Sequence, residues 1–230
     1  MSDLGETQGP ARGTATREAL VTAAIEVFGR DGFGAASTRA ISQAAGVNQA
    51  LIGYHFGGKP GLYNAALRHI AESVRARMGP LLEAIEAELS AAGEAGSAKG
   101  GASRSLELLH RLTGAFVQVL ISDESASWAR LILREQQDPS EGFDILYEGI
   151  MRQMFDVTTS LVRRVRRENR VSQQTRLLAV TILGQALVFR AARTVVMREM
   201  AWRRVTPAQV RKIQALLRHN VAAMLQETSS

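Results

Sequence analysis

Apolar positions recur every three to four residues along most of this 230-residue chain, a spacing typical of amphipathic helices. The first such stripe lies within 16–30 and consists of Leu20, Ala23, Ala24, Val27 and Phe28. Two short helices are expected at 38–45 and 49–56, because Gly46-Val47-Asn48 interrupts the pattern between them. The pattern therefore predicts three helices close to the N-terminus.

The rest of the chain is also predicted to be helical. The expected helices are 61–89, 104–121, 126–137, 141–168, 173–201 and 207–226. Thr206, Pro207 and Gln209 have the spacing of a capping box at the start of the last one. Residues 1–15 are predicted to be a disordered arm, and the glycine-rich stretch 91–103 a flexible linker. The fold class expected from this pattern is all-α.

Composition excludes several classes of protein. The chain has no cysteine, so it has neither disulfides nor thiolate metal sites. Its first residues are polar and lack the apolar core of a signal peptide. The longest nearly apolar stretch, Leu177–Phe189, is shorter than the ~20 residues of a membrane span. A soluble, cytoplasmic protein is expected.

The net charge of +6 indicates a polyanionic partner, but it does not locate the site. Residues 1–60 contain five basic and five acidic residues, so the whole surplus lies later in the chain. Charge alone would therefore place a nucleic acid on the second half.

The segment Ser37–Lys59 carries the strongest functional pattern, because it contains two short helices joined by a glycine turn. Ile41, Ala45, Val47, Ile52 and Phe56 are expected to share a core with the first helix. Burial of these residues would hold the second helix outward, as a helix that enters the DNA major groove must be held. The segment 37–56 is thus a candidate helix-turn-helix.

The residues left outside that core have the chemistry of a DNA-binding surface. Asn48 and Gln49 begin the second helix, and their amides suit base edges, while Leu51 suits a thymine methyl group. The remaining positions are expected to hold the phosphate backbone or to lie against the duplex. The candidate DNA-binding residues are Thr38, Arg39, Asn48, Gln49, Ala50, Leu51, Tyr54, His55 and Lys59.

The run from Thr16 to about Ala66 resembles the DNA-binding domain of the TetR family of transcriptional regulators. The matching motifs, in order, are Phe28 with Gly32-Phe33, Thr38-Arg39-Ala40-Ile41, Ala44-Ala45-Gly46-Val47, Tyr54-His55-Phe56, Lys59 and Leu62-Tyr63. The chain departs from the family at Gly53, where many members have an aromatic residue that helps to hold the DNA backbone. The resemblance implies a helix-turn-helix domain at 16–66 and a helical effector-binding and dimerisation domain at 67–230.

Residues 126–170 resemble the C-terminal domain of the CecR-like subgroup, through Arg130-Leu131-Ile132, Arg134-Glu135, Pro139 and Phe143. This resemblance implies a homodimer and a small hydrophobic or amphipathic effector of unknown identity, with no cofactor. The candidate effector-binding residues are Phe116, Trp128, Arg130, Arg134, Phe143, Tyr147, Met151 and Phe189.

The terminal helices 173–201 and 207–226 are expected to form the dimer interface. Their apolar faces consist of Ala179, Ile182, Leu183, Ala186 and Phe189 on the first and Val210, Ile213, Leu217, Val221 and Leu225 on the second. The same faces could instead belong to the core of one chain.

The function expected from these patterns is that of a ligand-responsive repressor that binds a palindromic operator as a dimer. One alternative is a helical-bundle metalloenzyme, suggested by Glu107 and His110, although a second Glu-x-x-His step is missing. The other alternative is an interaction scaffold without DNA affinity. No catalytic or metal-binding residues are predicted, and the chain is not expected to be an enzyme.

Overall fold

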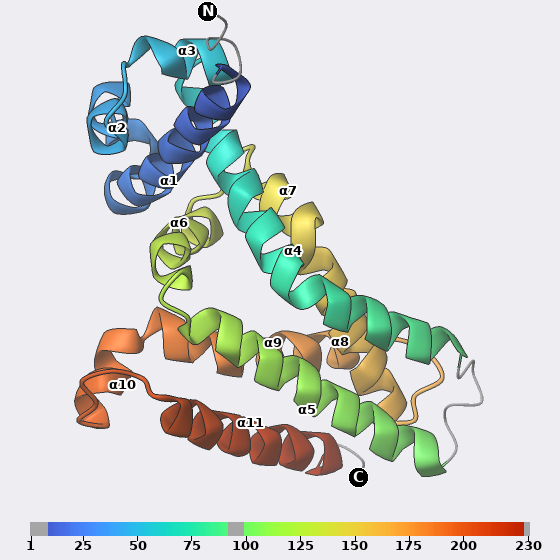
Figure 1. The fold of residues 1–230 in the computed structure, drawn as a ribbon. Helices are drawn as coiled ribbons and strands as arrows, with labels where there is room; N and C mark the ends of the chain where they lie inside the picture. The colour runs from blue at the N-terminus through green and yellow to red at the C-terminus, as the bar shows by residue number, and fades with distance from the viewer. Residues whose placement is uncertain (1–8, 92–98, 228–230) are drawn as a thin grey trace, which may run out of the picture. The chain divides into compact units, whose positions relative to one another are not determined.

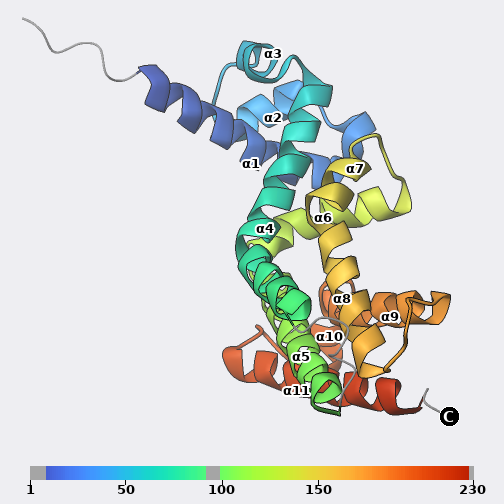
Figure 2. The same cartoon turned by 90° about the vertical axis from the view of Figure 1, so that its right-hand side faces the viewer.

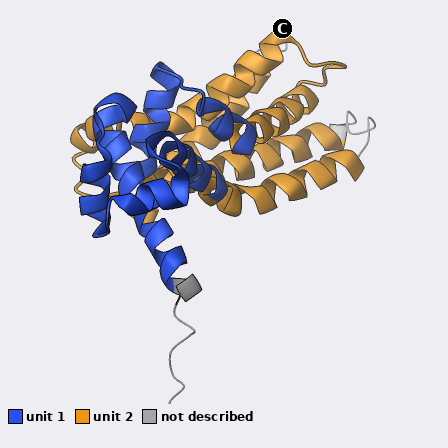
Figure 3. Cartoon of the chain, turned by 90° about the horizontal axis from the view of Figure 1, so that it is seen from above, with its two compact units in different colours: residues 1–72, 126–149 blue, residues 73–125, 150–230 orange. Residues whose placement is uncertain are grey.

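The computed structural model describes residues 9–91 and 99–227, and no strand occurs among them. Contacts divide the chain into two compact units, which Figure 3 distinguishes by colour. Unit 1 consists of residues 1–72 and 126–149, and unit 2 of residues 73–125 and 150–230. The predicted all-α class is confirmed.

Unit 1 contains the predicted helix-turn-helix. Its helices are α1 (Gly9–Ala35), α2 (Thr38–Ala45), α3 (Ala50–Phe56), the first part of α4 (Lys59–Ala91), α6 (Ser125–Gln137) and α7 (Phe143–Leu146). Leu20 and Phe28 of α1, Ile41 of α2, Ile52 of α3 and Leu62 of α4 are almost fully buried. Apolar burial is the main stabilising term in folding, so these side chains hold α1 to α4 together. Figure 1 shows the courses of these four helices.

The arm predicted at 1–15 is wrong for residues 9–15, which are helical. Helix α1 begins at Gly9, and Pro10 stands in its first turn, where a missing N–H is harmless. Residues 1–8 lie outside the described part of the chain. At its other end, α1 is interrupted at Gly32, whose φ of 79° is a left-handed conformation that glycine adopts readily.

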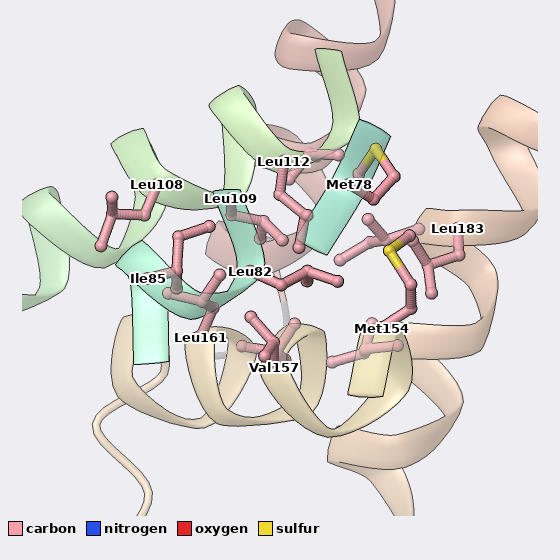
Figure 4. Close-up of a cluster of buried hydrophobic side chains, with 14 of the residues drawn as sticks. Met78, Leu82, Ile85, Leu108, Leu109, Leu112, Met154, Val157, Leu161 and Leu183 are labelled. Atoms are coloured by element: carbon pink, nitrogen blue, oxygen red, sulfur yellow. The ribbon is translucent and has the colours of Figure 1, made fainter. Parts of the chain in front are cut away.

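Unit 2 is built around α5 (Lys99–Ile121), which contacts α8 (Arg152–Val165), α9 (Gln173–Ala191) and α11 (Pro207–Glu227). The second part of α4 and the short α10 (Arg193–Glu199) complete the unit. Figure 4 shows side chains from α4, α5, α8 and α9 meeting in one core. The labelled residues are Met78, Leu82, Ile85, Leu108, Leu109, Leu112, Met154, Val157, Leu161 and Leu183.

Three predicted segments differ in the structure. Within the linker predicted at 91–103, residues 99–103 are the first turn of α5, while 92–98 lie outside the described residues. The predicted helix 141–168 consists of α7, a π-helix (Tyr147–Met151) and α8. The predicted helix 173–201 bends by 74° between α9 and α10. Helical periodicity continues across such breaks, so the pattern alone did not reveal them.

A side chain at Gly149, inside the π-helix, would collide with α4. A Cβ atom there would lie 2.7 Å from the Cβ atom of Ala71. Glycine therefore permits the close approach of the π-helix to α4 within unit 1, and Figure 2 shows α7 beside the first part of α4.

The capping box predicted at Thr206 is present. The Thr206 N–H donates to the Gln209 Oε1 at 2.6 Å, and the Gln209 N–H donates to the Thr206 hydroxyl at 3.4 Å. A second capping box, which sequence reasoning did not single out, joins Ser172 and Thr175 at the start of α9. Within the described residues, no single helix is long and apolar enough to cross a membrane. The bent pair α9–α10, taken together, has the length and the composition of a membrane span.

Candidate DNA-binding site

Local hydrogen bonds define the turn between α2 and α3. The Ser37 hydroxyl accepts the N–H of Ala40 at 3.1 Å and so caps α2. Gly46 ends α2 with a φ of 67°, and its N–H donates to the carbonyl of Gln43. The Asn48 side chain then accepts the N–H of Ala50 at 2.8 Å at the beginning of α3. Each of these hydrogen bonds joins residues that are only two or three positions apart in the sequence. For this reason the sequence predicted both helices closely.

Helix α3 is buried on one side and open on the other. Ile52 is 2% exposed, whereas Tyr54 is 82% exposed. Asn48, Gln49 and Ala50 at its start are also exposed. The side that carries the amides is therefore accessible to a duplex, as a recognition helix requires.

The other predicted residues of α3 are less exposed. His55 is half-buried, and its ring lies 4.9 Å from that of Tyr54 in an edge-on arrangement. Leu51 is also half-buried, although the sequence analysis placed it on the outward face. Part of the Leu51 side chain remains accessible to a thymine methyl group.

A hydrogen bond connects the two helices at the exposed surface. The Gln49 Nε2 donates to the Thr38 hydroxyl at 2.8 Å. The Gln49 amide retains a carbonyl oxygen and a second N–H, so it can still contact a base edge. Arg39, beside Thr38 in the first turn of α2, is exposed. The structure thus brings Thr38, Arg39, Asn48 and Gln49 to one end of the α2–α3 pair.

Lys59 lies at the start of α4 and contacts the end of α1. Its Nζ donates to the carbonyl of Gly34 at 3.1 Å and lies 4.8 Å from the centre of the Phe33 ring. One of three ammonium N–H bonds is therefore used inside unit 1, and the others remain for a phosphate.

Arg17 on α1 was missed by the sequence analysis. Its guanidinium carbon lies 5.5 Å from the centre of the Phe56 ring, at the last residue of α3, and the residue is exposed. It adds a positive charge beside α3. The sequence signal that could have identified Arg17 is a basic residue on the polar side of the first helix.

The predicted effector-binding residues are divided between the two units. Trp128, Arg130, Arg134, Phe143 and Tyr147 belong to unit 1, and Phe116, Met151 and Phe189 to unit 2. Phe116 and Phe189 pack against the core formed by Val117, Ala186, Ile213 and Leu217. Arg134 donates to the carbonyl of Arg30 at 3.0 Å, so its guanidinium is engaged by α1.

Unit 2 contains a cavity of about 380 Å³ that none of these predicted residues lines. Its walls are the end of α4 and the exposed side of α8, through Glu86, Leu89, Ser90, Asp156, Val157, Ser160, Arg163 and Arg164. The volume is within the range of small-molecule sites.

Glu107, one of the two residues that suggested a metalloenzyme, has another partner. The Glu107 carboxylate accepts a bond from Arg104 at 2.6 Å. Burial, with the nearby Arg218, lowers the pKa of His110. Among the described residues, no three histidine or carboxylate side chains gather as a metal site would need.

Two protein families match this chain. Residues 20–66 match the family described as bacterial regulatory proteins of the tetR family. Residues 106–228, more than half of the chain, match the C-terminal domain of the HTH-type transcriptional dual regulator CecR. The chain therefore belongs to the TetR family of DNA-binding transcriptional regulators, which are not enzymes. Its C-terminal part is of the CecR type.

Relatives match over nearly the whole chain. CecR from Shigella flexneri is 26% identical over 193 residues, which cover 83% of this chain and 82% of CecR. A TetR-family structure from Mesorhizobium loti is 21% identical, with a TM-score of 0.54 and coverage of 94% and 97%. The regulator FadR from Bacillus subtilis is 17% identical, with a TM-score of 0.51 and coverage of 87% and 96%. TetR-family regulators bind DNA as dimers and bind small-molecule effectors.

Proposed function

We propose that this regulator is a cytoplasmic, ligand-responsive repressor that binds a palindromic operator as a homodimer. The observation that carries the proposal is the exposure of Asn48, Gln49 and Tyr54 around a recognition helix anchored by Ile52. In a two-fold dimer, two copies of α3 would enter successive major grooves ~34–36 Å apart. Occupancy of the operator would then exclude RNA polymerase.

Within this site, the proposed roles differ. Asn48 and Gln49 contact base edges, and Leu51 contacts a thymine methyl group, with Ala50 close to the duplex. Thr38, Arg39, Tyr54, His55 and Lys59 hold the phosphate backbone and determine the register of the protein.

The dimer interface is proposed on α9 and α11, but not on the faces that periodicity suggested. Ala179, Ile182, Leu183 and Ala186 are buried in their own chain, as are Ile213, Leu217, Val221 and Leu225. A different stripe of α9 is open to solvent, because Leu177, Val180 and Val188 are 58%, 53% and 47% exposed. Leu216 of α11 is 51% exposed. Exposed apolar side chains at helical spacing suit a symmetric helical interface.

The proposed effector is a small hydrophobic or amphipathic molecule. FadR of Bacillus subtilis forms a complex with stearoyl-CoA, which has an acyl chain and a charged end. Effector binding can change operator affinity only through different affinities for two arrangements of the protein. For seven of the eight residues expected at the effector-binding site, the assignment stays a prediction. The eighth, Arg134, donates hydrogen bonds to carbonyls of α1.

The test is selection of an operator by the purified protein. We expect it to enrich a two-fold symmetric sequence from random duplexes, and we expect the affinity to fall steeply with salt. A footprint on the selected site should protect two half-sites. Equal affinity for all duplexes would contradict the proposal and favour the scaffold. Genome-wide occupancy with and without candidate acyl compounds then tests the effector class.

A further inference from the structure

Helix α6 and the turn after it belong to the same compact unit as the helix-turn-helix, although residues 73–125 separate them in sequence. Figure 1 shows α6 beside α1, and hydrogen bonds join the two helices. The pair Arg134-Glu135, which the sequence analysis linked to the CecR-like subgroup, lies in α6. Its side chains contact α1 and Tyr63 of α4.

Glu135 is a buried carboxylate whose partners are hydrogen-bond donors. It is 2% exposed, accepts the Tyr63 hydroxyl, and accepts the N–H and the hydroxyl of Ser140 at 3.2 and 3.0 Å. Burial of a carboxylate is costly unless donors surround it, so this arrangement depends on all of them. Burial and the bond to Glu135 raise the pKa of Tyr63, which keeps the phenol protonated as a donor.

Arg134, the preceding residue, binds the end of α1. Its guanidinium donates to the carbonyls of Arg30 and Gly29 at 3.0 and 3.5 Å, just before the break at Gly32. A Cβ atom at Gly32 would lie 2.8 Å from the Arg134 Nη1, so glycine makes room for the guanidinium. A cation suits this position, because the last carbonyls of a helix lack internal partners and carry partial negative charge.

We propose that Arg134, Glu135 and Ser140, which we name the α6 clasp, position the DNA-binding helices for operator recognition. Arg134 holds α1 and Glu135 holds Tyr63 in the second turn of α4. These two helices flank α2 and α3, so the clasp restricts the orientation of α3 within unit 1. The proposal rests on the proposed function, because it assumes that α3 recognises the operator.

The segment that contains the clasp is covalently continuous with unit 2. Residues 126–149 continue into unit 2 at both ends, and the second crossing falls inside the π-helix. A change in unit 2 that displaced this segment would therefore act on Tyr63 and on the end of α1 directly.

The test compares single substitutions in α6 and α4. Arg134→Ala removes the bonds to α1, and Gln137→Ala, at an exposed position of the same helix, is the control. Tyr63→Phe removes only the hydroxyl, since the ring can keep its contacts with Phe28 and Phe33 at 4.9 and 5.0 Å. Glu135→Gln retains a carbonyl acceptor for Tyr63 and checks whether hydrogen bonding suffices.

Two measurements are made on the full-length dimer. Dissociation constants are determined for the selected operator and for a scrambled duplex, and amide hydrogen exchange is followed in residues 29–36 and 59–66 without DNA. We expect Arg134→Ala and Tyr63→Phe to weaken operator binding about tenfold, with less than a twofold effect on the scrambled duplex. Exchange in both segments should accelerate, and Gln137→Ala should behave like the wild type.

Operator affinities that stay unchanged in Arg134→Ala and Tyr63→Phe would overturn the inference, as would equal losses on both duplexes. Faster exchange without loss of operator affinity would also overturn it, because it would indicate a merely structural role. Failure of the proposed function is recognised earlier, since the wild-type protein would then distinguish no duplexes at all.

Discussion

At the scale of the residue, single polar side chains in unit 1 combine support of the fold with exposure to a duplex. Asn48 caps α3 while it remains exposed, and Gln49 joins the two helices through Thr38. Lys59 binds the end of α1 with one N–H and has others free. Substitutions here are therefore best judged by separate measurements of stability and of DNA binding.

Gln49→Ala should reduce discrimination at one operator position by about 1–3 kcal/mol, because a base edge loses its amide partner. Stability should change little, since the bond to Thr38 is exposed. Competition binding with single-base operator variants measures this effect. Gln43→Ala, on the exposed side of α2, is the control. Unchanged base preference in Gln49→Ala would show that the recognition residue is misassigned.

Lys59→Ala should weaken binding to every duplex and reduce the slope of log affinity against log salt by about one. The reason is the loss of one phosphate contact, which carries no sequence information. Salt titrations with operator and scrambled duplexes measure it. An unchanged slope would mean that Lys59 serves only the contact with Phe33 and Gly34.

At the scale of the element, glycines mark places where the helices end, bend or approach one another. Gly46 ends α2 and Gly57 ends α3, both with positive φ. Gly53 differs, because it lies inside α3, and a Cβ atom there would meet nothing within 4 Å. Gly142 differs in the opposite way, because its Cβ atom would lie 2.4 Å from the buried Leu67.

Gly53→Ala should therefore stabilise the protein by about 1 kcal/mol, since alanine loses less conformational entropy in a helix. Gly142→Ala should destabilise it by about 1–3 kcal/mol through overpacking against Leu67. Urea unfolding without DNA measures both free energies. A destabilising Gly53→Ala would mean that α3 is not helical at this residue in solution.

At the scale of the whole molecule, the relevant property of the family is that TetR-family regulators bind DNA as dimers. In a single chain, the exposed apolar side chains of Leu177, Val180 and Val188 on α9 remain uncovered. A symmetric interface of stable size buries far more surface than these few side chains, and for this reason the proposed interface also includes α11.

Val180→Asp together with Val188→Asp should weaken dimerisation at least about a hundredfold, because unpaired charges would be buried in the interface. Operator affinity should fall with it, while the far-ultraviolet circular dichroism stays that of the wild type. Sedimentation equilibrium measures the association. Ala84→Asp, on the exposed side of α4, is the control. A stable dimer in the double variant would move the interface to another surface.

Local physical chemistry predicted the two short helices and the turn between them, and the resemblance to the TetR family identified them as a helix-turn-helix. The Ser37 cap, the Gly46 turn and the apolar spacing around Ile41 and Ile52 act within one or two helical turns, so they are legible in the chain. The helix at 38–45 agrees with the structure residue by residue. The first helix was predicted too short, because the residues from Gly9 onward are polar and rich in glycine and show no apolar periodicity of a helix.

Packing between distant segments could not be foreseen in the same way. A helical stripe indicates that a face will be buried, but not whether its own chain or a partner covers it, and Ile182 and Ile213 proved to be intramolecular core. Arg134 and Tyr63 are separated by many residues, and only folding brings them to α1 and Glu135. The amino-acid order thus predicted most of the helices and the side chains proposed to face DNA, whereas nonlocal burial determined which faces meet and where Arg134 binds.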